Sequence, residues 1–273
     1  MSNQAFLVDP GALANAAPGQ TVTLDGPEGH HAVSVKRVRE GERIDLVDGG
    51  GRRAACVVVT TAKGFLEARV ETLEVEPSPA LRTVLVQALA KGDRDLQAVE
   101  SAVELGIDRV VPWQAERCVV RWTPDKAARG RQKWESTVRA AVKQSRRSRE
   151  PSVGEPVNTN QLAAMARTHG TQGTGGGTEV PGGRLTVVLH ETATEPLSRV
   201  VQMRLAQGKP PVEILLVVGP EGGIAPGELD KLVSAGAATA SLGTNVLRAS
   251  TAGPAALVLV RHLAGLLDGS VRN

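Results

Sequence analysis

The chain has 273 residues, a net charge of +3 at pH 7 and 41% hydrophobic residues, which suits a soluble protein of two domains or one large one. Its apolar stretches are too short to span a bilayer, and residues 1–10 lack the basic and apolar regions of a secretory signal, so we expect a cytoplasmic protein without a membrane partner. Cys56 and Cys118 fit no metal-binding pattern and are expected to be free thiols.

Residues 1–75 are expected to form a small β-rich domain. Short β-branched or alternating runs predict strands at 21–24, 43–47, 55–60 and 66–73. The run Asp-Gly-Gly-Gly at 48–51 predicts a hairpin turn between two of them, which we favour over a phosphate-binding role. Residues 28–39 predict a short helix, whose two histidines lack the further ligands of a metal site. A structural or RNA-contacting role is therefore favoured for His31, and no metal is expected.

The stiff polar segment Glu76-Pro-Ser-Pro79 marks the expected boundary between a first domain, 1–75, and a second, 76–273. Beyond it, predicted strands alternate with predicted helices, which is typical of βαβ units over a parallel sheet. The expected strands are 83–89, 109–113, 185–189, 214–218 and 239–242. The expected helices are one that carries Leu96, Val99 and Val103 and stops at Gly106, then 125–147, 227–235 and 251–267.

The segment 126–149 is strongly basic, with nine lysines and arginines and the single acid Glu135. Such a block favours a polyanionic partner, because phosphate neutralisation releases counterions. The alternative is a solvated helix face. Aromatic residues make up only 2% of the chain, which argues against a surface that stacks single-stranded bases and favours folded RNA or a flipped base. The glycine-rich segment 171–183 is expected to be a mobile loop.

The run 214–218 is entirely apolar, which predicts a strand buried on both faces of the sheet. It ends in a turn that contains Gly219, Gly222 and Gly223. Loops at the carboxyl ends of parallel strands hold the ligands of α/β proteins, so we favour a ligand site over a merely structural turn. The turn has neither the Gly-Lys-Ser/Thr ending of a phosphate-binding loop nor a dinucleotide fingerprint, so another nucleotide enzyme has weak support.

A second loop, 242–248, ends in Arg248, just before Ser250 and Thr251, which we expect to cap the last helix. The start of a helix already attracts anions, so a cation there needs a further reason. One reason is the binding of an anionic ligand or an RNA phosphate. The alternative is a structural ion pair with Glu221 or Glu228.

The two loops resemble paired motifs of a known family, the ribosomal RNA uridine-N3 methyltransferases (the RsmE family of the SPOUT superfamily). The motifs are Gly219-Pro-Glu-Gly-Gly223 with Glu228, and Leu242-Gly-x-x-Val-Leu-Arg248-x-x-Thr-Ala252. The resemblance extends to residues 88–93, 102–112, 116–121, 144–145, His31 with 35–38, and 41–44. It therefore covers most of the chain, and several ordered motifs at matching spacing make it specific.

The resemblance implies an S-adenosylmethionine-dependent methyltransferase that acts on a uridine of 16S ribosomal RNA in the small ribosomal subunit. It also implies an α/β fold: a C-terminal SPOUT domain with a deep trefoil knot at about 185–267, and an N-terminal PUA-like β-barrel that grips RNA. Members of the family act as homodimers.

The resemblance also implies roles for particular residues. The expected cofactor-binding residues are Leu189, His190, Gly219, Glu221, Gly222, Gly223, Leu242, Gly243, Val246 and Leu247. The expected RNA-binding residues are His31, Lys36, Arg37, Lys91, Arg117, Arg121, Arg146 and Arg147. Arg248 is the expected catalytic residue. Because arginine stays charged, it would hold the flipped base or stabilise developing negative charge rather than accept the N3 proton. No histidine or aspartate in the two motifs is an obvious base, so the base stays unassigned.

The chain departs from the family pattern at four positions in the C-terminal motifs. Asn245 replaces an arginine, Ala249 and Ser250 replace Thr-Glu, and Ala225 replaces a serine or threonine. These departures motivate an alternative from another class, an RNA-binding or ribosome-assembly factor of the same fold whose catalysis is impaired.

Overall fold

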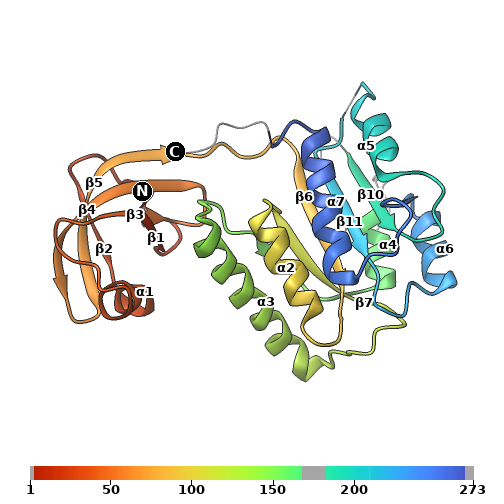
Figure 1. The fold of residues 1–273 in the computed structure, drawn as a ribbon, viewed down its shortest axis with the longest axis horizontal. Helices are drawn as coiled ribbons and strands as arrows, with labels where there is room; N and C mark the ends of the chain where they lie inside the picture. The colour runs from red at the N-terminus through yellow and green to blue at the C-terminus, as the bar shows by residue number, and fades with distance from the viewer. Residues whose placement is uncertain (1–2, 168–182, 209, 268–273) are drawn as a thin grey trace. The chain divides into compact units, whose positions relative to one another are not determined.

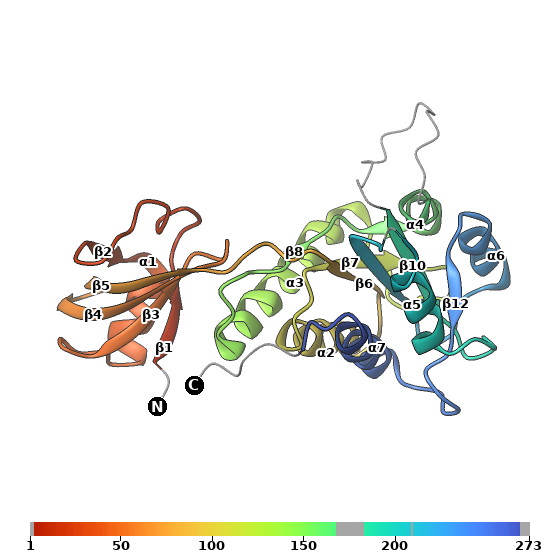
Figure 2. The same cartoon turned by 90° about the horizontal axis from the view of Figure 1, so that it is seen from above.

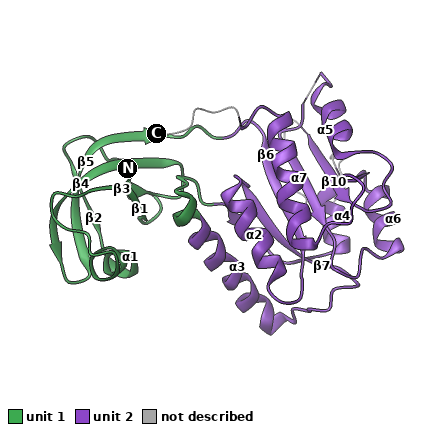
Figure 3. Ribbon diagram, viewed as in Figure 1, with its two compact units in different colours: residues 1–78, 142–150, 273 green, residues 79–141, 151–272 purple. Residues whose placement is uncertain are grey.

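The computed structural model describes residues 3–167, 183–208 and 210–267. The chain forms two compact units (Figure 3). The first comprises Met1–Ser78 with Val142–Glu150, and the second comprises Pro79–Ala141 with Pro151–Arg272. The glycine-rich segment 171–183, apart from Gly183, lies outside the described residues.

The described part of the first unit contains a five-stranded sheet with the order β1-β3-β4-β5-β2. Its strands are β1 (Gln4–Leu7), β2 (Thr21–Leu24), β3 (Arg43–Val47), β4 (Arg52–Ala62) and β5 (Phe65–Val75). Neighbouring strands pair antiparallel, except for β1 and β3, which are parallel. The four predicted strands are confirmed, and β4 and β5 extend beyond their predicted ends. The sequence reasoning missed β1, because only four residues pair and only Phe6 and Leu7 are buried.

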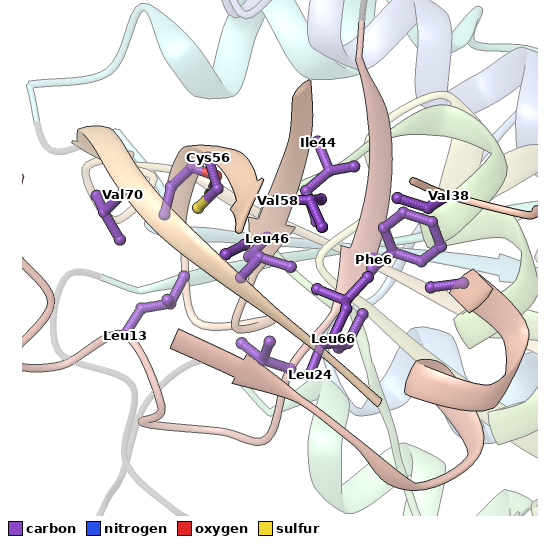
Figure 4. Close-up of a cluster of buried hydrophobic side chains, with 14 residues drawn as sticks. Phe6, Leu13, Leu24, Val38, Ile44, Leu46, Cys56, Val58, Leu66 and Val70 are labelled. Atoms are coloured by element: carbon purple, nitrogen blue, oxygen red, sulfur yellow. Dashed lines mark hydrogen bonds between the residues drawn. The ribbon is translucent and has the colours of Figure 1, made fainter. Parts of the chain in front are cut away.

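A cluster of buried apolar side chains fills the interior of the first unit (Figure 4). It takes residues from all five strands and Ala32 from the π-helical turn His31–Val35, which continues the short helix α1 (Gly26–His30). Gly29 lets this segment approach closely, since a Cβ there would lie 2.5 Å from the Gly64 carbonyl oxygen and 2.6 Å from that of Leu24. Cys56 lies in this core as a free thiol, and burial raises its pKa to about 12.

Residues 142–150 join the first unit through specific contacts, although the sequence reasoning assigned them to the second domain. Lys143 forms an ion pair with Glu28. The Gly51 amide donates to the Ser148 carbonyl oxygen at 3.0 Å, and a Cβ on Gly51 would lie 2.7 Å from the Arg149 guanidinium carbon. The glycines of the β3–β4 hairpin therefore make the turn and also leave room for this incoming segment.

The described part of the second unit contains a parallel sheet with the order β12-β10-β11-β6-β7-β8, and β9 also pairs with β7. Its strands are β6 (Arg82–Ala88), β7 (Arg109–Gln114), β8 (Ser152–Val153), β9 (Val157–Asn158), β10 (Arg184–Leu189), β11 (Glu213–Val218) and β12 (Ala238–Ala240). Every residue of β11 is buried, which confirms the prediction of a strand covered on both faces.

Helices cover both faces of this sheet (Figures 1 and 2). One face carries α2 (Arg94–Glu104), α5 (Leu197–Leu205) and α7 (Ala249–Leu263), and the other carries α4 (Thr159–Ala166) and α6 (Pro226–Ser234). The long basic helix is α3 (Pro124–Ser145). The short helices α4 and α5 and the short strands β8 and β9 were not predicted. No helix in the described ranges is long and apolar enough to cross a membrane.

The last helix differs from its prediction at both ends. It begins at Ala249 rather than Thr251 and ends at Leu263 rather than residue 267. Its N-cap is Arg248, whose side chain makes no capping hydrogen bond, and Ser250 is buried inside the first turn. The predicted cap by Ser250 or Thr251 is therefore wrong, because both residues already belong to the helix.

Candidate active site

Because the strands of the second unit are parallel, their carboxyl ends lie at one edge of the sheet. The loops that follow β6, β7, β10, β11 and β12 therefore all leave from this edge. In the strand order, β11 lies between β10 and β6, and β10 lies between β12 and β11. All ten predicted cofactor residues lie on β10 or in the loops after β10, β11 and β12. The fold thus brings these residues to neighbouring loops of one edge.

The loop after β11, residues 219–223, is called the glycine loop here. The Gly223 amide donates to the Pro220 carbonyl oxygen at 2.9 Å, which closes a tight turn. Gly223 has a φ of +73°, a conformation that favours glycine. A Cβ on Gly219 would lie 2.7 Å from Cγ1 of Ile224. Glu221, Gly222 and Gly223 are exposed, so the loop presents a bare main chain to solvent.

Two neighbouring loops hold the glycine loop from its sides. After β6, Arg94 at the start of α2 forms an ion pair with Glu221 at 3.0 Å, and the Lys91 amide of the preceding loop donates to the same carboxylate at 3.3 Å. From the loop after β7, Arg117 Nη1 donates to the Gly222 carbonyl oxygen at 3.2 Å. Lys91 and Arg117, both predicted to bind RNA, therefore also contact the glycine loop.

Glu228, in the first turn of α6, is a buried carboxylate that accepts hydrogen bonds from three segments. Its Oε1 accepts from the Glu116 amide at 3.0 Å and from the Thr159 hydroxyl. Its Oε2 accepts from the Ala225 amide at 3.4 Å. Thr159 in turn accepts from the Trp113 indole nitrogen at 3.2 Å. Glu228 thus ties the loop after β7 to the start of α6 and of α4.

The loop after β12, residues 242–248, has backbone amides without acceptors in the described residues. No backbone amide from Leu242 to Arg248 donates a hydrogen bond within the described residues. Leu242 and Leu247 are half-buried, whereas the Val246 side chain is 76% exposed. Gly243 has a φ of +81°. The loop therefore offers free amides together with apolar side chains.

The end of β10 lies next to this second loop. Leu189 is the pairing partner of Ala240 in β12, and the His190 amide donates to the Ala240 carbonyl oxygen at 3.0 Å. The His190 ring is half-buried, and its Nδ1 lies 2.9 Å from the Thr192 hydroxyl. Leu189 and His190 therefore lie beside the start of the 242–248 loop.

Arg248 is exposed at the start of α7. Across the described part of the chain its guanidinium makes no ion pair or hydrogen bond. Glu221 pairs with Arg94, and Glu228 is occupied by three donors. The alternative of a structural pair between Arg248 and either carboxylate is therefore wrong. A cation without a partner, at the start of a helix, is available to a ligand.

The predicted RNA-binding residues are divided between the two units. In the first unit, the half-buried His31 ring meets the Phe6 ring edge-on with centroids 6.4 Å apart. Lys36 and Arg37 are exposed directly after the π-turn, and Arg37 has a φ of +56°. Arg146 is also exposed with a positive φ of +55°, and Arg147 follows it half-buried.

In the second unit, Lys91, Arg117 and Arg121 are exposed on the loops after β6 and β7. Arg121 donates to the Glu116 carbonyl oxygen of its own loop. Cys118 lies between these arginines as a buried free thiol, and burial raises its pKa to about 11. Cys118 is therefore protonated at neutral pH and is no candidate for the missing base.

The contacts of Arg94 and Thr159 were missed by the sequence reasoning. Arg94 looks like an ordinary residue of the first turn of α2, and Thr159 belongs to a helix that was not predicted. Their partners lie 127 and 69 positions away in the chain. Contacts between residues so far apart in the chain leave no local sequence pattern. The motif spacing of Glu228, five residues after the glycine loop, was the one available signal.

Comparison with known proteins defines the class of protein. A family model described as an RNA methyltransferase domain matches residues 76–261, and one described as an RNA methyltransferase PUA domain matches residues 24–71. The parallel α/β unit with its loop-lined edge and the N-terminal β-rich unit are thus those of an RNA methyltransferase. The mixed α/β fold with an N-terminal PUA domain is confirmed.

The curated relatives narrow the class to one family. Ribosomal RNA small subunit methyltransferase E of Mycobacterium tuberculosis (strain CDC 1551 / Oshkosh) is 42% identical over 255 residues, which cover 93% of this chain and 91% of that protein. The Bacillus subtilis protein of the same name is 27% identical, and the match covers 91% of this chain and 93% of that protein. The chain belongs to the ribosomal RNA small subunit methyltransferase E family, which confirms the resemblance found in its motifs.

Solved structures agree with this assignment. Ribosomal RNA small subunit methyltransferase E from Neisseria gonorrhoeae, bound to S-adenosyl methionine, has a TM-score of 0.78 and 25% identity, covering 96% of this chain and 98% of that one. A Legionella pneumophila protein solved with the bound cofactor SAM has a TM-score of 0.78 and 26% identity, with the same coverage. The likeness extends over nearly the whole chain in both cases.

Proposed function

We propose that this chain transfers a methyl group from S-adenosylmethionine to N3 of a uridine in 16S ribosomal RNA of the small ribosomal subunit. The observation that carries the proposal is the 42% identity to a ribosomal RNA small subunit methyltransferase E over 93% of the chain, with both loop motifs present. The uridine and its N3 atom come from the family resemblance of the two motifs.

The residues at the sheet edge fit such a cofactor. S-adenosylmethionine carries an adenine and a carboxylate, which need hydrogen-bond donors, and when bound it supplies an electrophilic methyl group. The free amides from Leu242 to Arg248 are such donors. Leu242, Val246 and Leu247 can cover the adenine, and Gly219, Gly222 and Gly223 leave room beside the main chain. We further assign Leu189, His190, Glu221 and Gly243 to the same cofactor site.

Within this site, Glu221 contributes mainly through its main chain, because its carboxylate is engaged by Arg94 and by the Lys91 amide. The site is therefore held chiefly by backbone groups. This explains why its sequence signature is a pattern of glycines rather than a set of charged side chains.

Arg248 is the proposed catalytic residue. Uridine N3 loses a proton as the methyl group arrives, and negative charge develops on the ring as that proton leaves. A guanidinium without a protein partner can donate to the ring oxygens that carry this charge. Arg248 stays protonated, so it stabilises the charge and orients the base. The proton acceptor is left unassigned.

RNA binding is assigned to basic residues of both domains, 1–75 and 76–273. The proposed contacts are His31, Lys36, Arg37, Lys91, Arg117, Arg121, Arg146 and Arg147. Two of them, Arg37 and Arg146, have a left-handed backbone, which costs energy for a side chain with a Cβ and is concentrated at functional sites. This unusual conformation supports their selection for binding rather than for stability.

Three further features are proposed: a deep trefoil knot over about 185–267, a homodimeric active form and a cytoplasmic location. The family resemblance supports the knot and the dimer, and the proposed ribosomal RNA substrate supports the location. Static light scattering on the full chain tests the dimer directly, and a mass of about one chain at micromolar concentration would contradict it.

The function is tested by methyl transfer from labelled S-adenosylmethionine to isolated small subunits and to naked 16S RNA, with the product identified as N3-methyluridine by mass spectrometry. Arg248→Ala should lower the transfer rate roughly 100-fold or more, the size of effect seen when one charge-stabilising donor is removed, with unchanged thermal unfolding. Arg199→Ala, at an exposed surface ion pair, is the matched control.

Two outcomes would contradict parts of this proposal. Wild-type turnover in Arg248→Ala would refute the role of that residue. RNA binding without any methyl transfer by the wild-type chain would instead favour the assembly-factor alternative.

A further inference from the structure

Two loops at the sheet edge form a closed ring of contacts. The loop after β7 reaches the glycine loop through Arg117, whose Nη1 lies 3.2 Å from the Gly222 carbonyl oxygen. The two loops meet again at Glu228, which accepts from the Glu116 amide at 3.0 Å and from the Ala225 amide at 3.4 Å. We call these three hydrogen bonds the loop brace.

The loop brace favours glycine at position 222. A Cβ on Gly222 would lie 3.2 Å from Cβ and 3.3 Å from the carbonyl oxygen of Arg117, which is tighter than ordinary contact. The main chains of the two loops therefore touch. This glycine is explained by a neighbouring loop of the same chain, independently of any ligand.

The loop brace uses both carboxyl oxygens of Glu228 as acceptors. Two donors converge on its Oε1 and one on its Oε2, and all three need an acceptor. The Thr159 oxygen also accepts from the Trp113 indole nitrogen, so this hydroxyl links Glu228 to Trp113. A glutamine has one acceptor oxygen and one NH2 group. The isosteric change to glutamine would therefore set two N–H donors against each other.

We propose that Arg117 and Glu228 are positioning residues that hold the glycine loop in its binding conformation. The inference rests on the proposed function, since the glycine loop is taken as part of the cofactor site. It assigns Arg117 a task in the absence of RNA, whereas an arginine that only contacts phosphate would have none. The loop that carries Arg117 and Arg121 then moves together with the cofactor loop, so RNA binding and cofactor binding support each other.

The test is the dissociation constant of S-adenosylmethionine, measured by calorimetry on the full chain without RNA. Arg117→Ala and Glu228→Gln should each weaken binding at least about fivefold, the lower end of typical coupling between sites. Arg117→Lys, which keeps a donor, should restore part of the affinity. Unchanged affinity in both variants, beside a wild type that binds, would overturn the proposal.

Two matched controls separate positioning from a general loss of charge. Arg109→Ala removes an exposed arginine at the amino end of β7, at the opposite end of that strand from the loop brace. Glu116→Gln removes an exposed charge and keeps the backbone amide that Glu228 needs. Both should bind the cofactor as the wild type does, and a fivefold loss in either would overturn the assignment to Arg117 and Glu228.

A second measurement needs no ligand. Hydrogen exchange of the Glu116, Gly223 and Ala225 amides should become at least about tenfold faster in Arg117→Ala and Glu228→Gln, since opening of the loops then costs less free energy. If the wild type binds no cofactor but these amides respond, the proposed function fails and the loop brace stands. Unchanged exchange would overturn the loop brace itself.

Discussion

Asp95, at the start of α2, is 6% exposed, and this burial raises the pKa of its carboxyl above the ordinary value of 3.8. Its Oδ1 accepts from the Leu96 amide at 3.0 Å, which only partly offsets the loss of solvation. The folded chain therefore binds the Asp95 proton more tightly than the unfolded chain does. The resulting stabilisation is present below the unfolded pKa and is lost as the pH rises through the folded pKa.

Asp95→Asn should therefore raise the free energy of unfolding at pH 7, where the wild type buries a charge, and the advantage should shrink as the pH falls towards 4. An asparagine oxygen can still accept from the Leu96 amide. Urea unfolding at three pH values measures the difference, and Asp230→Asn, at an exposed position of α6, is the control. A difference that does not change with pH would contradict the explanation.

The single residues of the site show which features sequence reasoning can reach. Gly219, Gly222 and Gly223 could be identified from the sequence. Glycine is the favoured residue where φ is above zero or where another segment approaches the main chain closely. The partners of Glu221 and Glu228 could not be predicted from the sequence, since contacts between distant segments leave no periodic signal. The suggestion that these carboxylates pair with Arg248 failed for the same reason.

At the level of elements, the long helix α3 contains a glycine that its intrinsic propensity does not explain. The Trp122 ring packs directly against Gly130. A Cβ at position 130 would lie 2.4 Å from Cε2 of that tryptophan. Trp122 in turn meets the buried Trp134 edge-on, with ring centroids 6.1 Å apart. The glycine therefore lets the end of the loop after β7 pack against α3.

Gly130→Ala should destabilise the chain although alanine is the better helix former. The propensity gain is about 1 kcal/mol, whereas overpacking costs about 1–3 kcal/mol, and a displaced Trp122 loses its contact with Trp134. Denaturant unfolding followed by tryptophan fluorescence measures the net loss. Gly227→Ala, in the first turn of α6 with no atom near its added Cβ, should instead stabilise. Equal effects of the two substitutions would contradict this account.

Elements with a strong pattern were predicted and short ones were not. Strand β11 was predicted to within one residue at its start, because burial on both faces leaves an unbroken apolar run. The helix α4 and the strands β8 and β9 have between two and eight residues, too few for a period to appear. The start of α7 was misplaced because Ser250 was interpreted as a cap, whereas it packs inside the first turn.

At the level of the whole molecule, the net charge of +3 conceals an uneven distribution of positive residues. Residues 142–150 belong to the first unit and carry Arg146 and Arg147, which we assign to RNA. The first unit therefore receives part of its basic surface from a segment far along the chain. We therefore expect its RNA affinity to depend on residues that lie outside the range matched by the PUA family model, 24–71.

Arg146→Glu combined with Arg147→Glu should weaken RNA binding and flatten its dependence on salt, by a slope of about 0.9 for each lost phosphate contact with a duplex. Filter binding at several salt concentrations measures the slope. Lys63→Glu combined with Arg69→Glu changes the net charge of the first unit equally at other exposed positions and should leave the slope close to that of the wild type. An unchanged slope in the first double variant would show that those arginines do not contact RNA phosphates.

The centre of the second unit's sheet joins segments that are synthesised far apart in time. Strand β11 pairs with β6 along its whole length, and the Lys91 amide meets Glu221 across 130 positions. Non-local pairing of this kind slows folding, because the entropy of closing a long loop is lost before the contacts provide any stabilisation. The first unit cannot be completed early either, since it includes residues 142–150. A nascent chain therefore has neither unit complete until just over half of it has left the ribosome that makes it, and the loop-lined edge of its sheet assembles only near the end of translation.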